Sequence, residues 1–215
     1  MEKEKLKAIV FDFDGTIADT EGFYADNFFE VMEGYGIHCD AEDRVTTLGY
    51  GPDEKVAIME KKYQVKLDSV TIAATFRKMN QERFPEDGSH LIFSDVKDAL
   101  DYCKKQGYAL YICSNTDSSK VKRITTQMGI IQYFDAIVGK DISGARKPSS
   151  DPYRFMLKQY GYRKEEMAAI EDSRTGVGSA KGAGISVIGL CRLEGLDLGE
   201  ADLLIRSLAE LKNII

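Results

Sequence analysis

Short apolar segments alternate with stretches of helical spacing from Ser94 to the end of the chain. Strands that alternate with helices in this way build a parallel sheet whose two faces are covered by the helices. The pattern therefore predicts an α/β fold with a Rossmann-like parallel sheet. The predicted strands are Tyr108–Cys113, Phe134–Val138, Met167–Ile170, Ser186–Leu190 and Ala201–Ile205, and the predicted helices are Val96–Gln106, Ser118–Met128, Pro152–Tyr160, Gly176–Lys181 and Leu208–Ile215.

A further strand is expected near the start of the chain. Ala8–Phe11 is a short apolar run of strand-favouring residues, as expected for a strand that is buried on both faces. The residues that follow it show helical patterns and no clear strand, which indicates a helical insertion after the first strand. We expect an α/β core of residues 1–19 and 89–215, and a helical domain of residues 20–88. The helices expected in the insertion are Glu21–Tyr35, Pro52–Tyr63 and Ser69–Phe84.

Composition narrows the classes of function. The chain has 215 residues, of which 43% are hydrophobic and 30% are charged, and its net charge is -6. This acidic balance offers no basic surface for nucleic acid or for an anionic membrane. No apolar stretch reaches the roughly 18 residues of a membrane span and no signal-peptide pattern opens the chain, so we expect a cytoplasmic protein. The four cysteines form no CxxC pair and the chain has two histidines, which argues against a clustered zinc site.

Two acidic residues follow the first predicted strand directly. Asp12 and Asp14, with Gly15 and Thr16 behind them, lie where an α/β sheet places its chemistry, just beyond the carboxyl end of a strand. One aspartate in such a loop can serve as a nucleophile, and a second can serve as a general acid or base. Because Asp and Gly are also common turn residues, an ordinary turn at the end of the strand is the alternative.

Three later strands also end in polar side chains that suit phosphate or a metal ion. Ser114 and the backbone N–H groups of the next helix can bind phosphate oxygens, although the same cluster suits an ordinary N-cap. Lys147, beside Pro148, can offer a compact positive charge to phosphate or to a carboxylate, or can be a solvated surface residue. Glu171 and Asp172 are hard oxygen ligands of the kind that Mg²⁺ prefers, or caps for the helix that follows.

Taken together, these segments resemble the haloacid dehalogenase-like hydrolases, which are mostly phosphatases and phosphomutases. The family pattern is DxDGT, then Ser or Thr, then Lys-Pro, then an acid pair before a Gly-rich helix start, and the chain has all of these in that order. The segment EDSRTGVGSAKGAG resembles the β-phosphoglucomutase-like and phosphoglycolate phosphatase-like subgroup, in which a helical cap is inserted after the first motif. The resemblance covers nearly the whole chain.

The resemblance implies a role for each matching residue. Asp12 would attack phosphorus and carry an aspartyl phosphate, while Asp14 would act as the acid and then as the base. Mg²⁺ would be held by Asp12, the backbone carbonyl of Asp14 and Asp172, with Glu171 contributing mainly through water. The catalytic residues implied are Asp12, Asp14, Ser114 and Lys147, and the substrate-binding residues are Gly15, Thr16, Asn115, Tyr24 and Tyr50.

Three functions are compatible with these residues. The first is a phosphatase that acts on a small phosphorylated metabolite. The second is a sugar phosphomutase of the β-phosphoglucomutase type, which in the family carries a His where this chain has Tyr24 and an Arg near Asp53. The third is a phosphorylation-regulated receiver domain, which has neither the DxD loop nor a helical insertion. We therefore expect the phosphatase.

Overall fold

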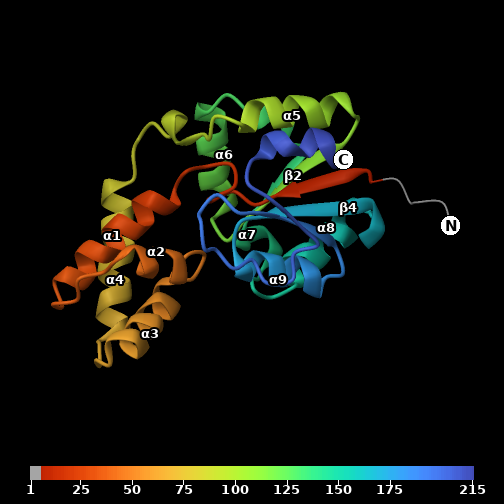
Figure 1. Ribbon diagram of the computed structural model, residues 1–215. Coiled ribbons are helices and arrows are strands. Elements are labelled where there is room, and N and C mark those ends of the chain that lie inside the picture. The colour runs from red at the N-terminus through yellow and green to blue at the C-terminus, as the bar shows by residue number, and fades with distance from the viewer. Residues whose placement is uncertain (1–5) are drawn as a thin grey trace. The chain divides into compact units, whose positions relative to one another are not determined.

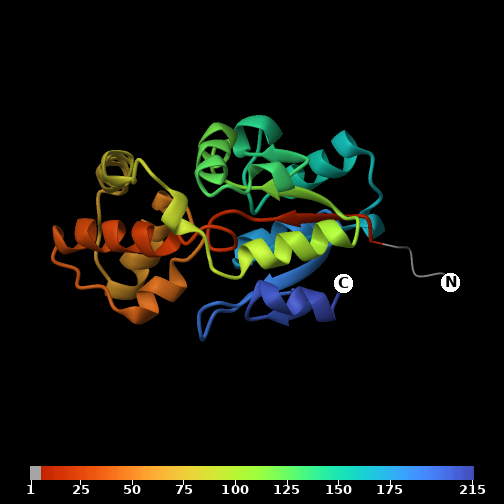
Figure 2. The same ribbon diagram turned by 90° about the horizontal axis from the view of Figure 1, so that it is seen from above.

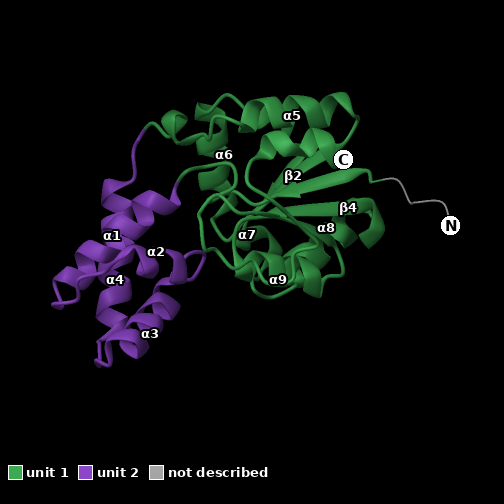
Figure 3. Cartoon of the chain, viewed as in Figure 1, with its two compact units in different colours: residues 1–19, 87–215 green, residues 20–86 purple. Residues whose placement is uncertain are grey.

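The computed structural model describes residues 6–215, and these form two compact units. Of the described residues, unit 1 comprises 6–19 together with 87–215, and unit 2 comprises 20–86 (Figure 3). None of the helices described in this range combines the length and the apolar character that a membrane span requires.

A six-stranded sheet forms the centre of unit 1, and every pair of neighbouring strands in it is parallel. The strand order is β3-β2-β1-β4-β5-β6, so β1 runs through the middle of the sheet (Figures 1 and 2). The order reverses between β1 and β4, which is the point where such sheets bind their ligands. The strands are β1 Ala8–Phe11, β2 Ala109–Cys113, β3 Ala136–Val138, β4 Met167–Glu171, β5 Ser186–Leu190 and β6 Leu203–Ile205.

Helices cover both faces of this sheet, as the sequence pattern predicts. Figure 1 shows α5 on one side of the sheet and α8 and α9 on the other. All four side chains of β1 are buried, because alternate residues of a strand point to opposite faces and both faces are covered here. The helices of unit 1 are α5 Val96–Lys105, α6 Ser118–Gln127, α7 Lys140–Ser143, α8 Asp151–Tyr160 and α9 Arg174–Gly182, with 3₁₀ turns at Ser89–Leu91, Ile131–Tyr133 and Lys164–Glu166.

The end of the chain differs from its prediction. The last segment is a short 3₁₀ helix, η4 Leu208–Asn213, where the apolar spacing predicts an α-helix to Ile215. The last strand begins at Leu203 and not at Ala201. At Asp202 the backbone N–H donates to the carbonyl of Val187 at 2.9 Å, and the side-chain carboxylate accepts a hydrogen bond from the N–H of Val187 at 2.7 Å. A side-chain oxygen thus takes the place of one backbone acceptor before the strand begins.

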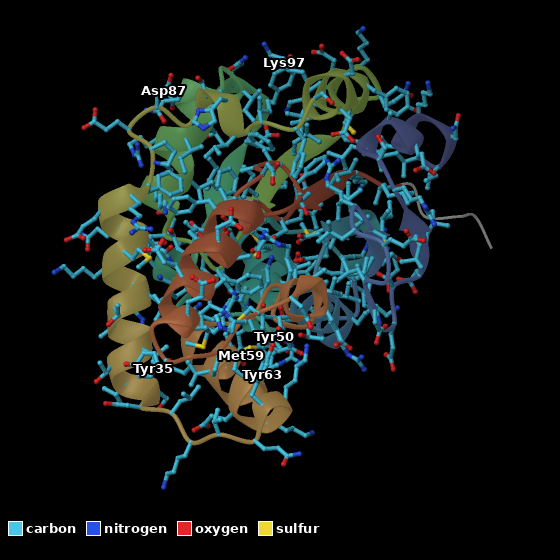
Figure 4. The ribbon with its side chains drawn as sticks, turned by 60° about the vertical axis from the view of Figure 1, so that its left-hand side comes forward. Tyr35, Tyr50, Met59, Tyr63, Asp87 and Lys97 are labelled. Atoms are coloured by element: carbon cyan, nitrogen blue, oxygen red, sulfur yellow. The ribbon has the colours of Figure 1, made fainter. Side chains whose placement is uncertain are left out.

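Unit 2 is a bundle of four helices with its own apolar core. The fully buried residues Phe28, Val56, Met59 (labelled in Figure 4) and Ile72 pack together in it. The ring of Phe28 meets the ring of Phe76 edge to face, with 5.5 Å between the centroids. The helices are α1 Glu21–Glu33, α2 Ala41–Thr46, α3 Pro52–Tyr63 and α4 Ser69–Arg83.

Helix α2 is absent from the sequence prediction. It has six residues, too few to show a helical period, and it begins with a capping box in which Asp40 and Asp43 each accept a backbone hydrogen bond from the other at 2.9 Å.

The chain leaves unit 1 and returns to it through two paired segments. Ala18 and Ile92 form an isolated antiparallel bridge. Beside it, the N–H of Asp19 donates to the carbonyl of Leu91 at 2.7 Å. The two ends of the insertion are therefore held together by the backbone of unit 1 itself.

Replacing Phe28 with alanine tests the core of unit 2. Removal of a fully buried aromatic ring leaves a cavity and costs about 3–5 kcal/mol of stability, measured by urea unfolding. Val70 on α4 is 76% exposed, so Val70→Ala serves as the control and changes stability by less than about 0.5 kcal/mol. Equal effects of the two changes would contradict this packing.

Candidate active site

The reversal point of the sheet brings two acidic loops together. Asp12 follows β1 directly, and its backbone N–H donates to the carbonyl of Ile170 on β4 at 2.9 Å. Glu171 is the last residue of β4, and Asp172 follows it. All three carboxylates are buried. The two acid motifs, far apart in sequence, therefore meet at the carboxyl ends of adjacent strands.

The DxDGT loop requires a glycine at its fourth position, residue 15. Gly15 has a φ of +79°, a left-handed conformation that side chains rarely adopt. A Cβ atom at this position would also collide with Oδ2 of Asp172. The loop can thus pass close to the Asp172 carboxylate only because residue 15 has no side chain.

Lys147 lies at the centre of the site. Its Nζ is 2.6 Å from Oδ1 of Asp12, 2.6 Å from Oε1 of Glu171 and 2.7 Å from the carbonyl oxygen of Cys113. Three oxygens thus surround an ammonium group that has three hydrogens to donate. The alternative of a solvated surface lysine is wrong, because only 4% of this side chain is exposed.

The charges in this cluster do not balance. Burial lowers the pKa of Lys147, but the carboxylates of Asp12 and Glu171 outweigh this and raise it above its ordinary value. Burial raises the pKa of Asp12, which Lys147 opposes and Asp14 reinforces. Burial likewise raises the pKa of Glu171 to about 7. One buried lysine faces several acids, so the site lacks positive charge.

Asp14 is hydrogen-bonded to the loop after β2. Oγ1 of Thr116 donates to Oδ2 of Asp14 at 2.7 Å, and Oγ of Ser114 lies 3.4 Å from the same oxygen. Ser114 also accepts a hydrogen bond from the N–H of Thr116. The sequence analysis identifies Ser114 but not Thr116. A second hydroxyl two residues further along the same loop would have been the signal to find it.

Asn115 has a structural task that the sequence does not reveal. Its side-chain amide donates to the carbonyl of Lys147 at 3.1 Å, and its Oδ1 accepts from the N–H of Lys147 at 2.8 Å. This pair of hydrogen bonds ties the loop after β2 to the loop that carries Lys147. Asn115 therefore helps to place the ammonium group beside Asp12.

Glu171 is enclosed by residues of two helices. The hydroxyl of the buried Tyr153, on α8, donates to its Oε1, and Gly176 at the start of α9 lies so close that a Cβ there would collide with the carboxylate. Its other oxygen, Oε2, is buried and has no hydrogen-bond partner among residues 6–215. Tyr153 was not identified from the sequence.

These acids fit a divalent metal ion. Asp12, Glu171 and Asp172 each offer a carboxylate oxygen, and the three oxygens lie within 4.8 Å of one another. The partnerless Oε2 of Glu171 and the shortage of positive charge both point to a cation as the missing partner. Oxygen ligands of this kind suit Mg²⁺.

The remaining predicted residues are Thr16, Tyr24 and Tyr50. Thr16 is buried in unit 1, where its carbonyl accepts a hydrogen bond from Arg192 at 3.1 Å. Tyr24 and Tyr50 belong to unit 2. The ring of Tyr24 contacts that of Phe23. Tyr50, labelled in Figure 4, precedes α3. Their roles in substrate binding remain predictions.

Comparison with known proteins places the chain in a family. Residues 9–190 match the family model of the haloacid dehalogenase-like hydrolases. A phosphorylated carbohydrates phosphatase of Thermotoga maritima is 28% identical over 185 residues, covering 85% of this chain and 84% of that protein. A phosphoglycolate phosphatase of Vibrio parahaemolyticus is 25% identical over 224 residues, covering 100% of this chain and 98% of that protein.

Solved structures show the same fold. A predicted phosphoglycolate phosphatase from Haemophilus somnus superposes with a TM-score of 0.76 at 22% identity, and 97% of each chain is covered. A variant of CbbY from Rhodobacter sphaeroides, in complex with xylulose-1,5-bisphosphate, superposes with a TM-score of 0.68 at 26% identity over 96% of each chain.

Replacing Gly15 with alanine tests the close approach of the two acidic loops. We expect turnover to fall by about 10²-fold or more, because the new Cβ displaces Asp172. Gly107→Ala is the matched control: its φ is +83°, but nothing lies within 4 Å of the added Cβ. Both changes carry the strain of left-handed backbone, roughly 1–2 kcal/mol, and only the first lowers activity. Equal losses of turnover in the two variants would contradict the close approach of the DxDGT loop to Asp172.

The family match and the site geometry lead to one conclusion. The predicted α/β fold is confirmed, and so is the prediction of a hydrolase of phosphoric monoesters, at the level of the family. The chain belongs to the haloacid dehalogenase-like hydrolases.

Proposed function

We propose that this hydrolase is a Mg²⁺-dependent phosphatase that acts on a small phosphorylated metabolite through an aspartyl phosphate on Asp12. The observation that carries the proposal is the buried contact of 2.6 Å between Oδ1 of Asp12 and Nζ of Lys147. The contact fixes the carboxylate in one orientation and balances part of its charge. A carboxylate so held at the carboxyl end of a central strand is suited to act as a nucleophile.

The chemistry requires an anionic nucleophile to approach an anionic ester. Asp12, Asp172 and the backbone carbonyl of Asp14 would hold the metal ion, with Glu171 as a further ligand, directly or through water. When bound, Mg²⁺ supplies the positive charge that offsets this repulsion. Lys147 adds its own positive charge beside Asp12.

Two steps follow for the protein groups. A carboxylate oxygen of Asp12 forms a bond to phosphorus while the bond from phosphorus to the leaving oxygen breaks, and Asp14 gives that oxygen a proton. Asp14 then takes a proton from the water molecule that attacks the aspartyl phosphate, which releases inorganic phosphate and restores Asp12. The hydrogen bond from Thr116 keeps the Asp14 carboxyl group oriented through both steps.

Other predicted residues have supporting roles in this proposal. Ser114 binds an oxygen of the phosphoryl group, together with the backbone of Gly15 and Thr16. Asn115 keeps Lys147 in place through its backbone. Tyr24 and Tyr50 belong to the helical unit, which we propose selects the leaving group.

The names of the similar proteins support a class of substrate. The similar proteins are phosphatases named for phosphoglycolate and for phosphorylated carbohydrates, which supports small phosphorylated acids and sugars as the first substrates to test. A cytoplasmic location fits such metabolites. No feature of the described residues favours nucleic acid or a membrane as a partner.

A pair of substitutions in the first motif tests the mechanism. Asp12→Asn removes the nucleophile, so turnover and phosphorylation both disappear. Asp14→Asn keeps the nucleophile but lacks the acid and base, and we expect turnover to fall by about 10²–10⁴-fold. With acetyl phosphate, whose leaving group needs little protonation, Asp14→Asn should accumulate the aspartyl phosphate.

Intact-protein mass spectrometry after incubation with acetyl phosphate and Mg²⁺ distinguishes the two variants. We expect an added phosphoryl mass on Asp14→Asn and none on Asp12→Asn. The reverse result would mean that the other carboxylate is the nucleophile.

A screen for phosphate release tests the activity itself. Sugar phosphates, phosphoglycolate and nucleotides are offered with Mg²⁺, and EDTA should abolish release because the acid cluster then lacks its cation. Full activity in EDTA would exclude the metal. Conversion of β-glucose 1-phosphate to the 6-phosphate faster than phosphate release would replace the phosphatase with the mutase.

A further inference from the structure

Tyr153 is a buried side chain with a polar contact in the centre of the active site. It lies on α8 with none of its surface exposed, and its hydroxyl donates to Oε1 of Glu171. The Nζ of Lys147 lies 5.5 Å from the centroid of its ring. One side chain therefore contacts both the last residue of β4 and the lysine that holds Asp12.

The hydrogen bonds to Glu171 are all on one oxygen. Oε1 receives the Tyr153 hydroxyl and lies 2.6 Å from Nζ of Lys147, whereas Oε2 has no partner in the described part of the chain. Two donors on one carboxylate oxygen fix the rotation of the group. The other oxygen, Oε2, lies beside Gly176 of α9, where the absent side chain leaves it space.

Packing alone does not account for the Tyr153 hydroxyl. The ring sits in an apolar cluster with Met156, Val177 and Ala180, where phenylalanine would fill the same volume. A buried hydroxyl costs free energy unless it is hydrogen-bonded, and this one is bonded to Glu171. The hydroxyl therefore contributes a hydrogen bond to the Glu171 carboxylate, whereas the ring alone fills the space in the core.

We propose that Tyr153 is a positioning residue for the metal site: its hydroxyl holds the Glu171 carboxylate in the cluster that it forms with Asp12 and Asp172. Residues that orient a metal ligand in this way set the affinity of the site, and their loss costs about 10–100-fold. The proposal rests on the Mg²⁺ site of the proposed function. Tyr153 itself touches neither substrate nor metal.

Tyr153→Phe tests the proposal, because it removes one oxygen atom and keeps the ring. We expect the dissociation constant for Mg²⁺ to rise about 10–100-fold. The constant is measured without substrate, by calorimetric titration with Mg²⁺ and by the rise in Tm with added Mg²⁺. In turnover assays, the loss should appear at limiting Mg²⁺ and be largely reversed at saturating Mg²⁺.

Tyr111→Phe is the matched control. Tyr111 is a buried tyrosine of the same unit, and its hydroxyl lies 3.3 Å from that of Tyr162, away from the acid cluster. We expect its Mg²⁺ affinity to equal that of the unmodified protein. If Tyr153→Phe also binds Mg²⁺ with unchanged affinity, or lowers Tm without changing the affinity, the residue is structural and the proposal is overturned.

A double variant tests whether Tyr153 acts through Glu171. Glu171→Gln should itself weaken Mg²⁺ binding, and adding Tyr153→Phe should then cause no further loss. If the losses of Mg²⁺ affinity from the two changes multiply in the double variant, Tyr153 does not act through Glu171 and the proposal is overturned. Because these titrations need no turnover, a protein that binds Mg²⁺ as expected but releases no phosphate would contradict the proposed function and leave the role of Tyr153 intact. A protein that binds no Mg²⁺ would overturn both.

Discussion

A single buried ammonium group joins three strands of the sheet. Lys147 reaches Asp12 after β1, the Cys113 carbonyl at the end of β2 and Glu171 at the end of β4. Burying that charge is costly in itself and is tolerated because each of its hydrogens faces an oxygen. Without it, the buried carboxylates of Asp12 and Glu171 would lose the positive charge that lies between them. The shape of the site and its electrostatics thus depend on the same contact.

The topology of the sheet makes this contact possible. Only strands that run parallel deliver their carboxyl ends to one edge, and only the reversal between β1 and β4 leaves room there for side chains from both. Gly15 and Gly176 complete the arrangement by leaving space for the carboxylates of Asp172 and Glu171. The Asp172 and Glu171 carboxylates can lie against the backbone at residues 15 and 176 because both positions are glycine.

The sequence singles out the acids at the ends of β1 and β4 and Lys147 in the loop before α8, because their order along the chain matches a family pattern, and the structure brings these side chains together. It does not predict Tyr153 or α2. A tyrosine on the core-facing side of a helix has the same spacing whether its hydroxyl is bonded to a carboxylate or not, and its partner Glu171 lies on another element. The short α2 depends on caps between Asp40 and Asp43 and has no periodicity to detect. A sequence pattern does not reveal hydrogen bonds between different elements, and it does not reveal helices of only a few residues.

The bridge between Ala18 and Ile92 has a consequence for the history of such enzymes. Because the two ends of the inserted segment are already hydrogen-bonded neighbours, a segment of another length can join the same two points of the core. The entropy of closing a longer segment rises slowly, by about 0.6 kcal/mol for each doubling of its length. Evolution can therefore exchange, shorten or enlarge this segment while the phosphoryl-transfer machinery stays unchanged, so that new specificities arise without the invention of new chemistry.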